Sequence, residues 1–470
     1  MYRKKRLQRE RQRCNIYSIS EDKKESCAAD WHKREMSVCS RLSFYVAGYR
    51  KDEILDMKEL IQKCFGRCSL LIRWVLVAGP TGVILGIFGG LFGRSITEVT
   101  AFRNGHPWML YLLPAAGLLI VAIYRLDPYK TGTNKVLEGV QSDTYVPLRM
   151  APLIVIATVL THACGGSAGR EGAALQLGGS IGGTLGKWMK FDEYDHKLMI
   201  MCGMSAGFSA LFGTPLTATI FAMEVISVGI MQYAALVPCA MASLIAHQVA
   251  LMVGAGSEQF DILNIPVFNL KTAVLTVLLG FLCGGVSILF CTVLHRTEHW
   301  YKEIIPNEWV RIVAGALLVI VMAKLLNTTD YLGTGMNVVE RALDGETEAA
   351  AFLLKIVFTA VTLGCGFRGG EIVPTLFVGA TFGCLFGQLT GLSPSMAAAC
   401  GMAAVFCGVT NCPISSMLLS FELFGFDFMP FILLTVGISY LESGYYGLYH
   451  SQKILYSKTK LQFINTHTKE

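Results

Sequence analysis

The sequence predicts an all-α, polytopic membrane protein, and three observations support this fold class. Of the 470 residues, 53% are hydrophobic. The hydrophobic residues gather in long apolar runs that short polar segments separate. The chain also carries 48 glycines, which weaken helices in water but allow helices to pack closely in a bilayer. Together these features exclude a soluble enzyme of ordinary composition.

The apolar runs give the expected order of the helices. Runs of about 20 residues can cross a bilayer, whereas shorter ones are typical of tilted, broken or re-entrant helices. We expect helices over Ser69–Phe92, Pro107–Arg125, Met150–Ala163, Ala234–Gly254, Ala273–Leu294, Val310–Leu326, Ala349–Gly364, Met396–Val409 and Phe428–Tyr440. Because these runs differ in length, the sequence predicts spans of both kinds.

The N-terminal part differs in composition from the rest. It opens with a block rich in Lys and Arg, and no apolar core of a signal peptide follows closely. Because positive flanks stay cytoplasmic, we expect a disordered cytoplasmic tail over 1–53, a membrane domain over 54–460 and a cytoplasmic tail over 461–470. The multi-pass protein is expected in the plasma membrane, in contact with the lipid bilayer. The basic positions 3–13 hold no aromatic residue, so nucleic-acid binding is not expected.

The 15 cysteines form neither a disulfide framework nor a metal site. From Cys164 onward they are mostly single residues in apolar segments, where cysteine serves as a small hydrophobic residue. His32 lies between Cys27 and Cys39, but this spacing fits no usual zinc pattern. We therefore expect no metal and no cofactor.

One glycine-rich stretch, Gly165–Gly183, is the best candidate for a functional site. It carries Arg170 and Glu171 side by side between apolar runs. A charged side chain at membrane depth costs roughly 2.5–3.5 kcal/mol on insertion scales, so a carboxylate there points to a function. A helix that starts near Glu171 would direct free N–H groups and its positive dipole end toward an anion. Because a carboxylate beside such a site competes with the anion, Glu171 is predicted to be a gate.

Parts of this stretch recur two hundred residues later. Gly166, Gly169, Glu171, Gly179 and Gly183 match Gly366, Gly369, Glu371, Gly379 and Gly383. Segments 213–224 and 411–422 are also similar, and in each a proline precedes a glutamate by nine residues. We interpret 69–255 and 270–445 as two related halves, with a binding site between them near the midplane of the membrane. The repetition alone does not state whether the halves are inverted.

These motifs resemble those of the CLC family of chloride channels and anion/proton antiporters, over about residues 69–460. The family's Gly-Lys/Arg-Glu-Gly-Pro stretch appears as Gly169–Ala173, and its Gly-x-Phe-x-Pro stretch as Gly370–Pro374 with Ile in place of Phe. Its late tyrosine corresponds to Tyr456, and its Gly-Ser-Gly-Ile-Pro stretch survives in altered form as Gly132–Val136. The resemblance implies the CLC fold, with two inverted repeats of tilted and re-entrant helices, and a homodimer with one pore per subunit.

The resemblance also implies roles for the matched residues. Glu171 would block the outer anion site when ionised and release it on taking up a proton. Hydroxyl groups and backbone N–H groups would hold the anion, because a full cation would bind it too tightly for transport. The residues expected to bind the anion are Thr133, Gly169, Arg170, Gly172, Glu371, Ile372 and Tyr456.

Several of these residues also have a purely structural interpretation. By itself, Tyr456 is typical of an interfacial aromatic residue and Thr133 of a loop or helix cap. Glu224 and Glu422 are predicted to be buried carboxylates bonded to backbone N–H groups rather than proton carriers. Arg170 is predicted to be a structural partner, and one of these two carboxylates is a candidate to pair with it.

The sequence leaves the ion and the mode of transport open. Proton-coupled members often carry an inner glutamate after the position of Glu224, where this chain has Val225. The departures at 132–136, Ala173 and 370–374 resemble the branch with bacterial fluoride/proton exchangers, whereas Thr133 resembles the serine of chloride transporters. We expect exchange of chloride or fluoride for protons, and a passive chloride channel is the alternative.

Two Gly-x-Ser-x-Gly matches raise a rival interpretation, an intramembrane serine protease. Ser167 and Ser205 are its candidate nucleophiles, and His247 lies in an apolar run. The nucleophile elbow needs a strand before the serine, and this region is predicted to be helical. We therefore predict a transporter and not an enzyme; a receptor or scaffold would show no ion flux.

Overall fold

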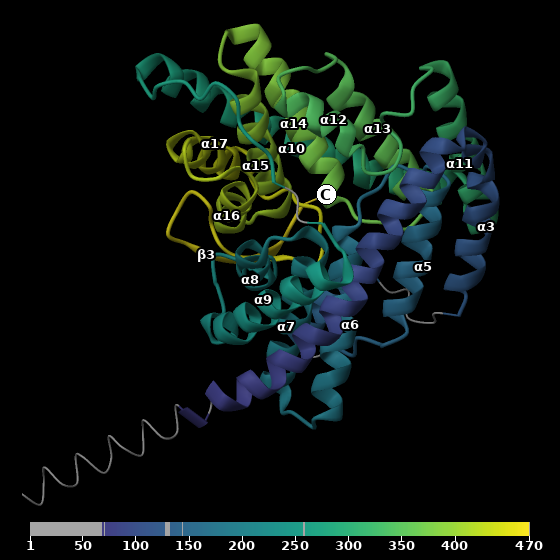
Figure 1. Cartoon of the computed structure of the whole chain (residues 1–470), viewed down its shortest axis with the longest axis vertical. Helices are drawn as coiled ribbons and strands as arrows, with labels where there is room; N and C mark the ends of the chain where they lie inside the picture. The colour runs from purple at the N-terminus through teal and green to yellow at the C-terminus, as the bar shows by residue number, and fades with distance from the viewer. Residues whose placement is uncertain (1–67, 70, 127–131, 143, 257–258, 470) are drawn as a thin grey trace, which may run out of the picture. The chain divides into compact units, whose positions relative to one another are not determined.

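The computed structural model describes residues 68–69, 71–126, 132–142, 144–256 and 259–469. Contacts divide the chain into two units, Met1–Arg73 and Trp74–Glu470. The predicted basic tail over 1–53 lies outside the described residues. Helices dominate the second unit (Figure 1), which confirms the predicted fold class.

A long helix, Leu71–Gly105, comes first among the described elements. The elements that follow are η1 (Pro107–Leu112), α3 (Leu113–Tyr124), α4 (Thr133–Ser142), α5 (Met150–Ala163), α6 (Glu171–Trp188), α7 (Glu193–Phe212), α8 (Pro215–Glu224), β1 (Ser227–Val228), η2 (Tyr233–Ala235), α9 (Leu236–Val253), α10 (Leu270–Ile304), α11 (Glu308–Leu325), α12 (Met336–Leu343), α13 (Ala351–Gly364), α14 (Ile372–Thr390), α15 (Pro394–Thr410), α16 (Pro413–Phe424), α17 (Met429–Glu442), β2 (Lys453–Tyr456) and β3 (Phe463–His467).

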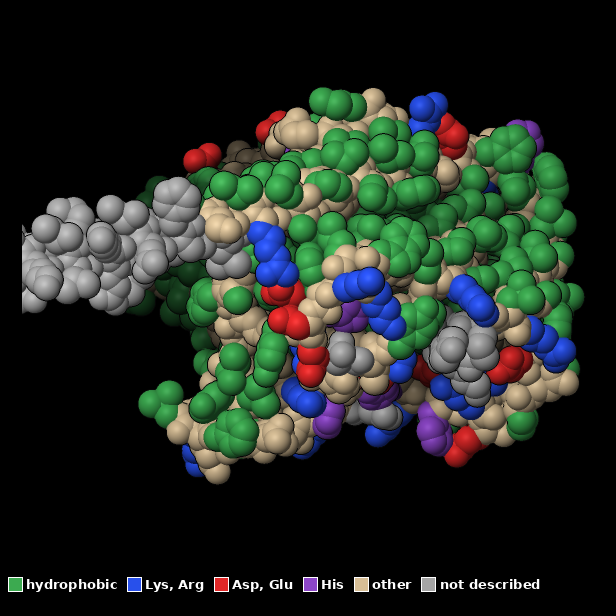
Figure 2. Space-filling view, turned by 90° about the horizontal axis from the view of Figure 1, so that it is seen from below, with side chains coloured by type: hydrophobic (Ala, Val, Ile, Leu, Met, Phe, Trp, Pro, Cys, Tyr) green, Lys and Arg blue, Asp and Glu red, His purple; other side chains and the backbone are tan. Residues whose placement is uncertain are grey.

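The described residues include both long and short apolar helices, as predicted. Helices long and apolar enough to cross a membrane cover Leu71–Gly105, Pro107–Tyr124, Tyr233–Val253, Leu270–Ile304 and Ile372–Thr390. Others, such as α5 and α13, have only 14 residues. Hydrophobic side chains cover much of the surface seen in Figure 2, whereas charged side chains gather in one region of it. Such a surface suits lipid rather than water.

Glycines end the two short helices α5 and α13 in the same way. Gly165 follows α5 with φ +86°, and Gly366 follows α13 with φ +118°. Residues with a side chain rarely adopt these angles, so glycine permits the chain to turn there without strain. After each turn the chain runs into the start of the next helix, α6 or α14. The two halves of the chain therefore repeat one helix–turn–helix unit.

Small residues let the helices that follow pack closely. α6 packs against α7, and α14 packs against α15 (Figure 1). A Cβ atom on Gly178 or on Gly203 would overlap the backbone carbonyl of the other residue, and the same holds for Gly379 and Gly401. The glycines thus serve the close packing that the sequence predicts.

Reciprocal hydrogen bonds relate the two halves. The carboxylate of Glu224, at the end of α8, accepts bonds from the N–H groups of Ile414 and Ser415 at 3.1 and 2.9 Å. Glu422, near the end of α16, accepts bonds of 2.8 Å from two N–H groups at the start of α8. Each helix thus ends where the other begins, so α8 and α16 are antiparallel and related by a two-fold axis across them. The halves are inverted repeats, and both carboxylates accept bonds from backbone N–H groups as predicted, although Glu422 is only partly buried. Neither is the partner of Arg170, so that expectation is wrong.

A small sheet adds to the all-α prediction. β1 pairs in parallel with β2, and β2 pairs antiparallel with β3. β3 lies in the segment 461–470 that the sequence suggests is a tail. Beside the sheet, the buried Gln452 donates bonds of 2.9 and 2.8 Å to the carbonyls of Val225 and Thr410. This side chain holds the C-terminal segment against both halves.

Candidate functional site

Three helices start close together at the centre of the second unit. α6 starts at Glu171 and α14 at Ile372, as predicted, and α4 starts at Thr133. An antiparallel bridge joins the segments before α6 and α14, since Gly169 and Gly370 exchange N–H···O bonds of 2.7 Å in both directions. Free N–H groups and positive dipole ends make each helix start favourable for an anion.

The carboxylate of Glu171 lies at the start of its own helix. Its side chain is fully buried. Oε2 accepts a bond of 3.1 Å from the N–H of Arg170, and the Arg170 guanidinium lies 3.4 Å from Oε1. A Cβ on Gly169 would come within 3.1 Å of Oε2, so only glycine leaves room for the carboxylate. The negative charge therefore sits where an anion would bind.

A second carboxylate, that of Glu371, lies across the bridge. A Cβ on Gly172 would be 3.3 Å from Oε2 of Glu371 and 3.8 Å from the hydroxyl of Thr133. This Oε2 atom is buried and has no hydrogen-bond partner among the residues that the structure describes. From the sequence, only the backbone N–H of Glu371 is expected in the site. The match of Glu171 with Glu371 between the repeats was the signal that could have identified the side chain.

Thr133 lies beside Gly172, and it has a partner that could not be expected from the sequence. Nε2 of the buried Gln176, on α6, donates a bond of 3.0 Å to the hydroxyl oxygen of Thr133. Because the hydroxyl accepts this bond, its own hydrogen remains to be donated elsewhere. No motif in the sequence singles out Gln176; the packing of α4 against α6 brings it to Thr133.

The structure does not place Tyr456 with these residues. Tyr456 is 42% exposed on β2, and its ring packs edge-on against that of Phe463 at 5.5 Å. Another tyrosine, Tyr449, is buried and close enough to Glu171 and Glu371 to interact with both electrostatically. Its hydroxyl has no hydrogen-bond partner within the described part of the chain. Since several tyrosines follow α17, only the fold of the C-terminal segment decides which one turns inward.

The two glutamates face opposite sides of the unit. We name each side after a contact between a cation and an aromatic ring. On the Lys324 face, the Lys324 ammonium lies 5.3 Å from the centre of the Tyr111 ring. On the Trp309 face, the Arg125 guanidinium lies 5.0 Å from the centre of the Trp309 ring. On the Trp309 face, Arg368 lies 4.3 Å from the ring of Tyr124 and interacts electrostatically with Glu371.

On the Lys324 face, a cavity of 340 Å³ reaches the residue next to Glu171. It is lined by Gly93, Arg94, Thr97, Glu98, Arg170, Leu211 and Gly254–Gly256. Several of these residues belong to the last turns of the Leu71–Gly105 helix. The next element along the chain, η1, contains Tyr111, which defines the Lys324 face. On this side the cavity therefore reaches Arg170, the residue next to the buried Glu171.

The two serines of the protease interpretation lack the geometry of a nucleophile elbow. Ser205 is buried within α7, where its hydroxyl donates to the carbonyl of Cys239 at 3.2 Å. Ser167 follows a helix rather than a strand, and its hydroxyl lies 3.2 Å from that of Thr359. Neither serine is bonded to a histidine among the described residues. This arrangement does not support covalent catalysis.

Comparisons with known proteins agree with this architecture. The family model described as "Voltage gated chloride channel" matches residues 116–444. A "Chloride/fluoride channel protein" from Pseudomonas syringae pv. tomato is 34% identical over 419 residues, which cover 87% of this chain and 90% of that protein.

Solved structures show the same relationship. The crystal structure of a CLC-type fluoride/proton antiporter superposes with a TM-score of 0.79 at 32% identity, covering 81% of this chain and 98% of that one. A slow cyanobacterial Cl⁻/H⁺ antiporter shares the fold, with a TM-score of 0.68 at 21% identity over 79% of this chain and 94% of its own. The chain therefore belongs to the CLC family of voltage-gated chloride channels and their relatives.

Proposed function

We propose that this protein exchanges a halide, fluoride or chloride, for protons across a membrane, with Glu171 as both gate and proton acceptor. One observation carries the proposal: a fully buried carboxylate occupies the start of α6, where an anion would otherwise bind. The names of the similar proteins, a chloride/fluoride channel protein and a fluoride/proton antiporter, support it.

Protonation of Glu171 links the two ions. The ionised carboxylate interacts with the N–H groups and the positive end of α6, and so excludes an anion. A protonated Glu171 carries no net charge and gives up this position. An anion can then take the helix start, so that proton uptake and the opening of the site are one event.

Glu371 supplies a second titratable group on the other side of the anion. Its Oε2 atom is buried without a hydrogen-bond partner in the described residues. Arg368, on the Trp309 face, interacts electrostatically with this carboxylate. An unpartnered buried carboxylate is costly as an anion, which favours proton binding. In this proposal protons reach the Trp309 face through Glu371, so the inner glutamate that Val225 replaces is not needed.

Neutral donors hold the anion between the two carboxylates. We assign this role to the hydroxyl of Thr133, the hydroxyl of Tyr449 and the backbone N–H groups at Gly172 and Ile372. Gly169 and Gly370 give the backbone room to approach the ion. Tyr449 takes the role that the sequence assigned to Tyr456, because Tyr449 is buried beside both glutamates. Arg170 acts through its contact with Glu171 rather than as a direct ligand.

For the assembly and the location of the protein, we keep the expectation from the sequence. We propose a homodimer with one pore in each subunit, placed in the plasma membrane with a cytoplasmic N-terminus. Cross-linking in membranes and accessibility labelling of the N-terminus test these two points.

Flux from proteoliposomes tests the function directly. The purified protein is reconstituted with fluoride or chloride inside, and the halide and the external pH are recorded together. Exchange predicts that a halide gradient moves protons against their own gradient, at a fixed ratio. Halide efflux without proton movement would instead establish the passive channel, and no efflux of either halide would refute transport.

A further inference from the structure

Three basic side chains gather on the Lys324 face of Glu171. Arg103 comes from the end of the Leu71–Gly105 helix, His162 from α5 and Lys355 from α13. Arg103 is 8% exposed, and the other two are fully buried. None of them forms an ion pair or a hydrogen bond with a carboxylate in the described part of the chain. The exchange mechanism proposed above uses none of them.

Gly333 joins Arg103 and Lys355. Nζ of Lys355 donates to the carbonyls of Gly333 at 2.8 Å and of Tyr331 at 3.3 Å. Nη1 of Arg103 would lie 2.7 Å from a Cβ on Gly333, and it donates to the carbonyl of His162 at 3.1 Å. The N–H of Gly333 in turn donates to the carbonyl of Gly166 at 3.1 Å, in the segment that leads to Glu171. This hydrogen bond therefore links the cluster to the segment that leads to Glu171, the proposed gate.

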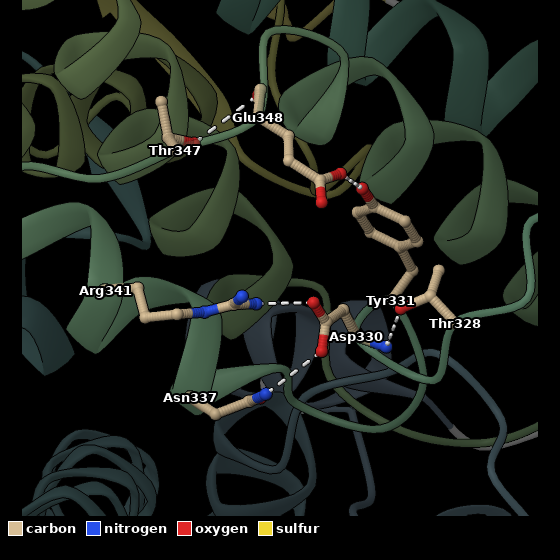
Figure 3. Close-up of polar contacts among 7 residues, drawn as sticks. All are labelled: Thr328, Asp330, Tyr331, Asn337, Arg341, Thr347 and Glu348. Carbon is tan, nitrogen blue, oxygen red and sulfur yellow. Dashed lines mark hydrogen bonds and ion pairs between the residues drawn. The ribbon is translucent and has the colours of Figure 1, made fainter.

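The acidic residues of the neighbouring loop do not neutralise the cluster. Figure 3 shows Asp330 held between Arg341 and Asn337. The hydroxyl of Tyr331 donates to Glu348 at 3.0 Å. These bonds fix the loop that presents its carbonyl groups to Lys355, and both carboxylates are engaged away from the lysine. The ammonium group has only neutral acceptors for two of its three protons.

His162 adds a ring nitrogen, Nε2, that can change from a hydrogen-bond acceptor to a donor. Nδ1 lies 2.8 Å from the carbonyl of Thr158, and a carbonyl only accepts, so Nδ1 carries a hydrogen. Nε2 is buried and has no partner among the described residues. The neutral ring can only accept a hydrogen bond at Nε2, whereas the imidazolium donates one. The charged groups that act on the ring are Arg103, Arg170, which is paired with Glu171, and Lys355.

Buried cations without a negative partner are costly, and a bound anion removes this cost. We propose that Arg103, His162 and Lys355 form a second binding site for a small inorganic anion, in which the anion binds together with a proton on His162. That the anion is the transported halide rests on the proposed function. The cavity lined by Arg170 lies on the same face, beside the helix that supplies Arg103. Because binding is reciprocal, the anion favours the proton as much as the proton favours the anion.

Equilibrium binding to the purified full chain tests the site. Sodium fluoride and sodium chloride are titrated by calorimetry between about pH 7.5 and about pH 4, a range that extends well below the ordinary histidine pKa of about 6.5. Lys355→Met should weaken halide binding about tenfold, the effect of losing one hydrogen bond to a charged group. Lys324→Met is the matched control, because it removes the same charge from an exposed lysine on the same face, and its affinity should not change.

A second variant tests the proton. Because Glu171 and Glu371 also titrate at the central site, this test uses the Glu171→Gln/Glu371→Gln background. In that background the affinity should rise as the pH falls, and the further change His162→Gln should remove this dependence, because glutamine can still donate to the carbonyl of Thr158 but does not titrate. Tyr449→Phe weakens only the central site, so the binding that remains in that variant should keep its dependence on pH.

The outcomes separate this proposal from the proposed function. Unchanged affinity in Lys355→Met overturns the second site, and so does a pH dependence that persists when His162→Gln is added to the Glu171→Gln/Glu371→Gln background. If Lys355→Met does not yield a monodisperse protein, His162→Gln alone decides. If the binding results hold but liposomes show no exchange, the site stands and the proposed function fails.

Discussion

Gly169 and Gly370 exchange two backbone hydrogen bonds, each of 2.7 Å, across the interface of the two halves. Each glycine lies shortly before a glutamate at a helix start, so this one contact brings Glu171 and Glu371 to opposite sides of a single site. A Cβ on Gly370 would lie 2.6 Å from the N–H nitrogen of Gly172. No side chain fits there, so Gly370, the first residue of the stretch Gly370–Pro374, is required by the geometry of the site.

Glu171→Gln removes the charge that competes with the anion but keeps the shape of the side chain. We expect halide flux that no longer depends on external pH and moves no protons. The readout is simultaneous halide and pH recording in liposomes, after monodispersity has been checked. Glu193→Gln, which changes an exposed carboxylate paired with Lys197, should behave like the wild type. Proton pumping by Glu171→Gln would show that the gate lies elsewhere.

Tyr449→Phe and Tyr456→Phe remove the same hydroxyl from a buried and from a half-exposed tyrosine. A hydrogen bond to a charged group contributes about 1.5–3 kcal/mol. Tyr449→Phe should therefore weaken halide binding by roughly tenfold or more, and Tyr456→Phe should leave it unchanged. Calorimetry distinguishes the two variants. The reverse result would restore the assignment made from the sequence.

Thr133→Val keeps the volume of the side chain but removes the hydroxyl that Gln176 orients. Fluoride is small and strongly hydrated, so it needs short, strong donors more than chloride does. We expect the fluoride-to-chloride flux ratio to fall in Thr133→Val and to stay near the wild-type value in Thr133→Ser. If both variants keep the ratio, Thr133 does not line the path of the ion.

Glu422→Gln tests the reciprocal caps of α8 and α16. The carboxylate accepts two backbone N–H bonds of 2.8 Å and a hydroxyl bond of 2.6 Å from Thr217. Loss of the charge should destabilise the fold by about 1–3 kcal/mol without changing the ion specificity. Thermal unfolding in detergent measures the effect, with the exposed Glu303→Gln as control. Normal stability combined with lost proton coupling would instead make Glu422 a proton carrier.

The protonation of Lys458 is expected to make the free energy of unfolding depend on pH. This residue follows β2 and donates to the carbonyl of Tyr440 at 2.9 Å and to the hydroxyl of Ser443 at 3.0 Å. Burial lowers the pKa of Lys458 to about 8. Above about pH 8 the unfolded chain therefore binds more protons at this residue than the folded chain does, so its contribution to stability rises with pH up to the ordinary lysine pKa of about 10.4.

Melting temperatures in detergent between about pH 7 and about pH 10 check this sign. The difference in stability between the wild type and Lys458→Met should shift in favour of the wild type as the pH rises. Lys460→Met, which changes an exposed lysine, should follow the wild type. A difference that stays constant over this range would mean that Lys458 does not titrate there.

The sequence by itself determined the fold class and the repeat, and it singled out Glu171 as the predicted gate. Apolar runs, glycines at helix contacts and the recurrence of Gly169 and Glu171 as Gly369 and Glu371 are local patterns, and local patterns survive without knowledge of the fold. For the same reason the starts of α6 and α14 could be predicted closely. The bonds that Glu224 and Glu422 accept from backbone N–H groups could be predicted from the cost of a lone charge in an apolar segment.

Only the tertiary structure decided which side chains meet. Tyr449 and Tyr456 belong to the same short stretch, and no periodicity distinguishes a tyrosine that turns inward from one on the edge of a small sheet. Gln176, the Glu371 carboxylate and the partners of Arg170 depend on contacts between segments far apart in the chain. The cluster of Arg103, His162 and Lys355 comes from three separate helices. That no carboxylate of the described residues pairs with it is a property of packing, because the charge balance of a buried site depends on what surrounds it in space.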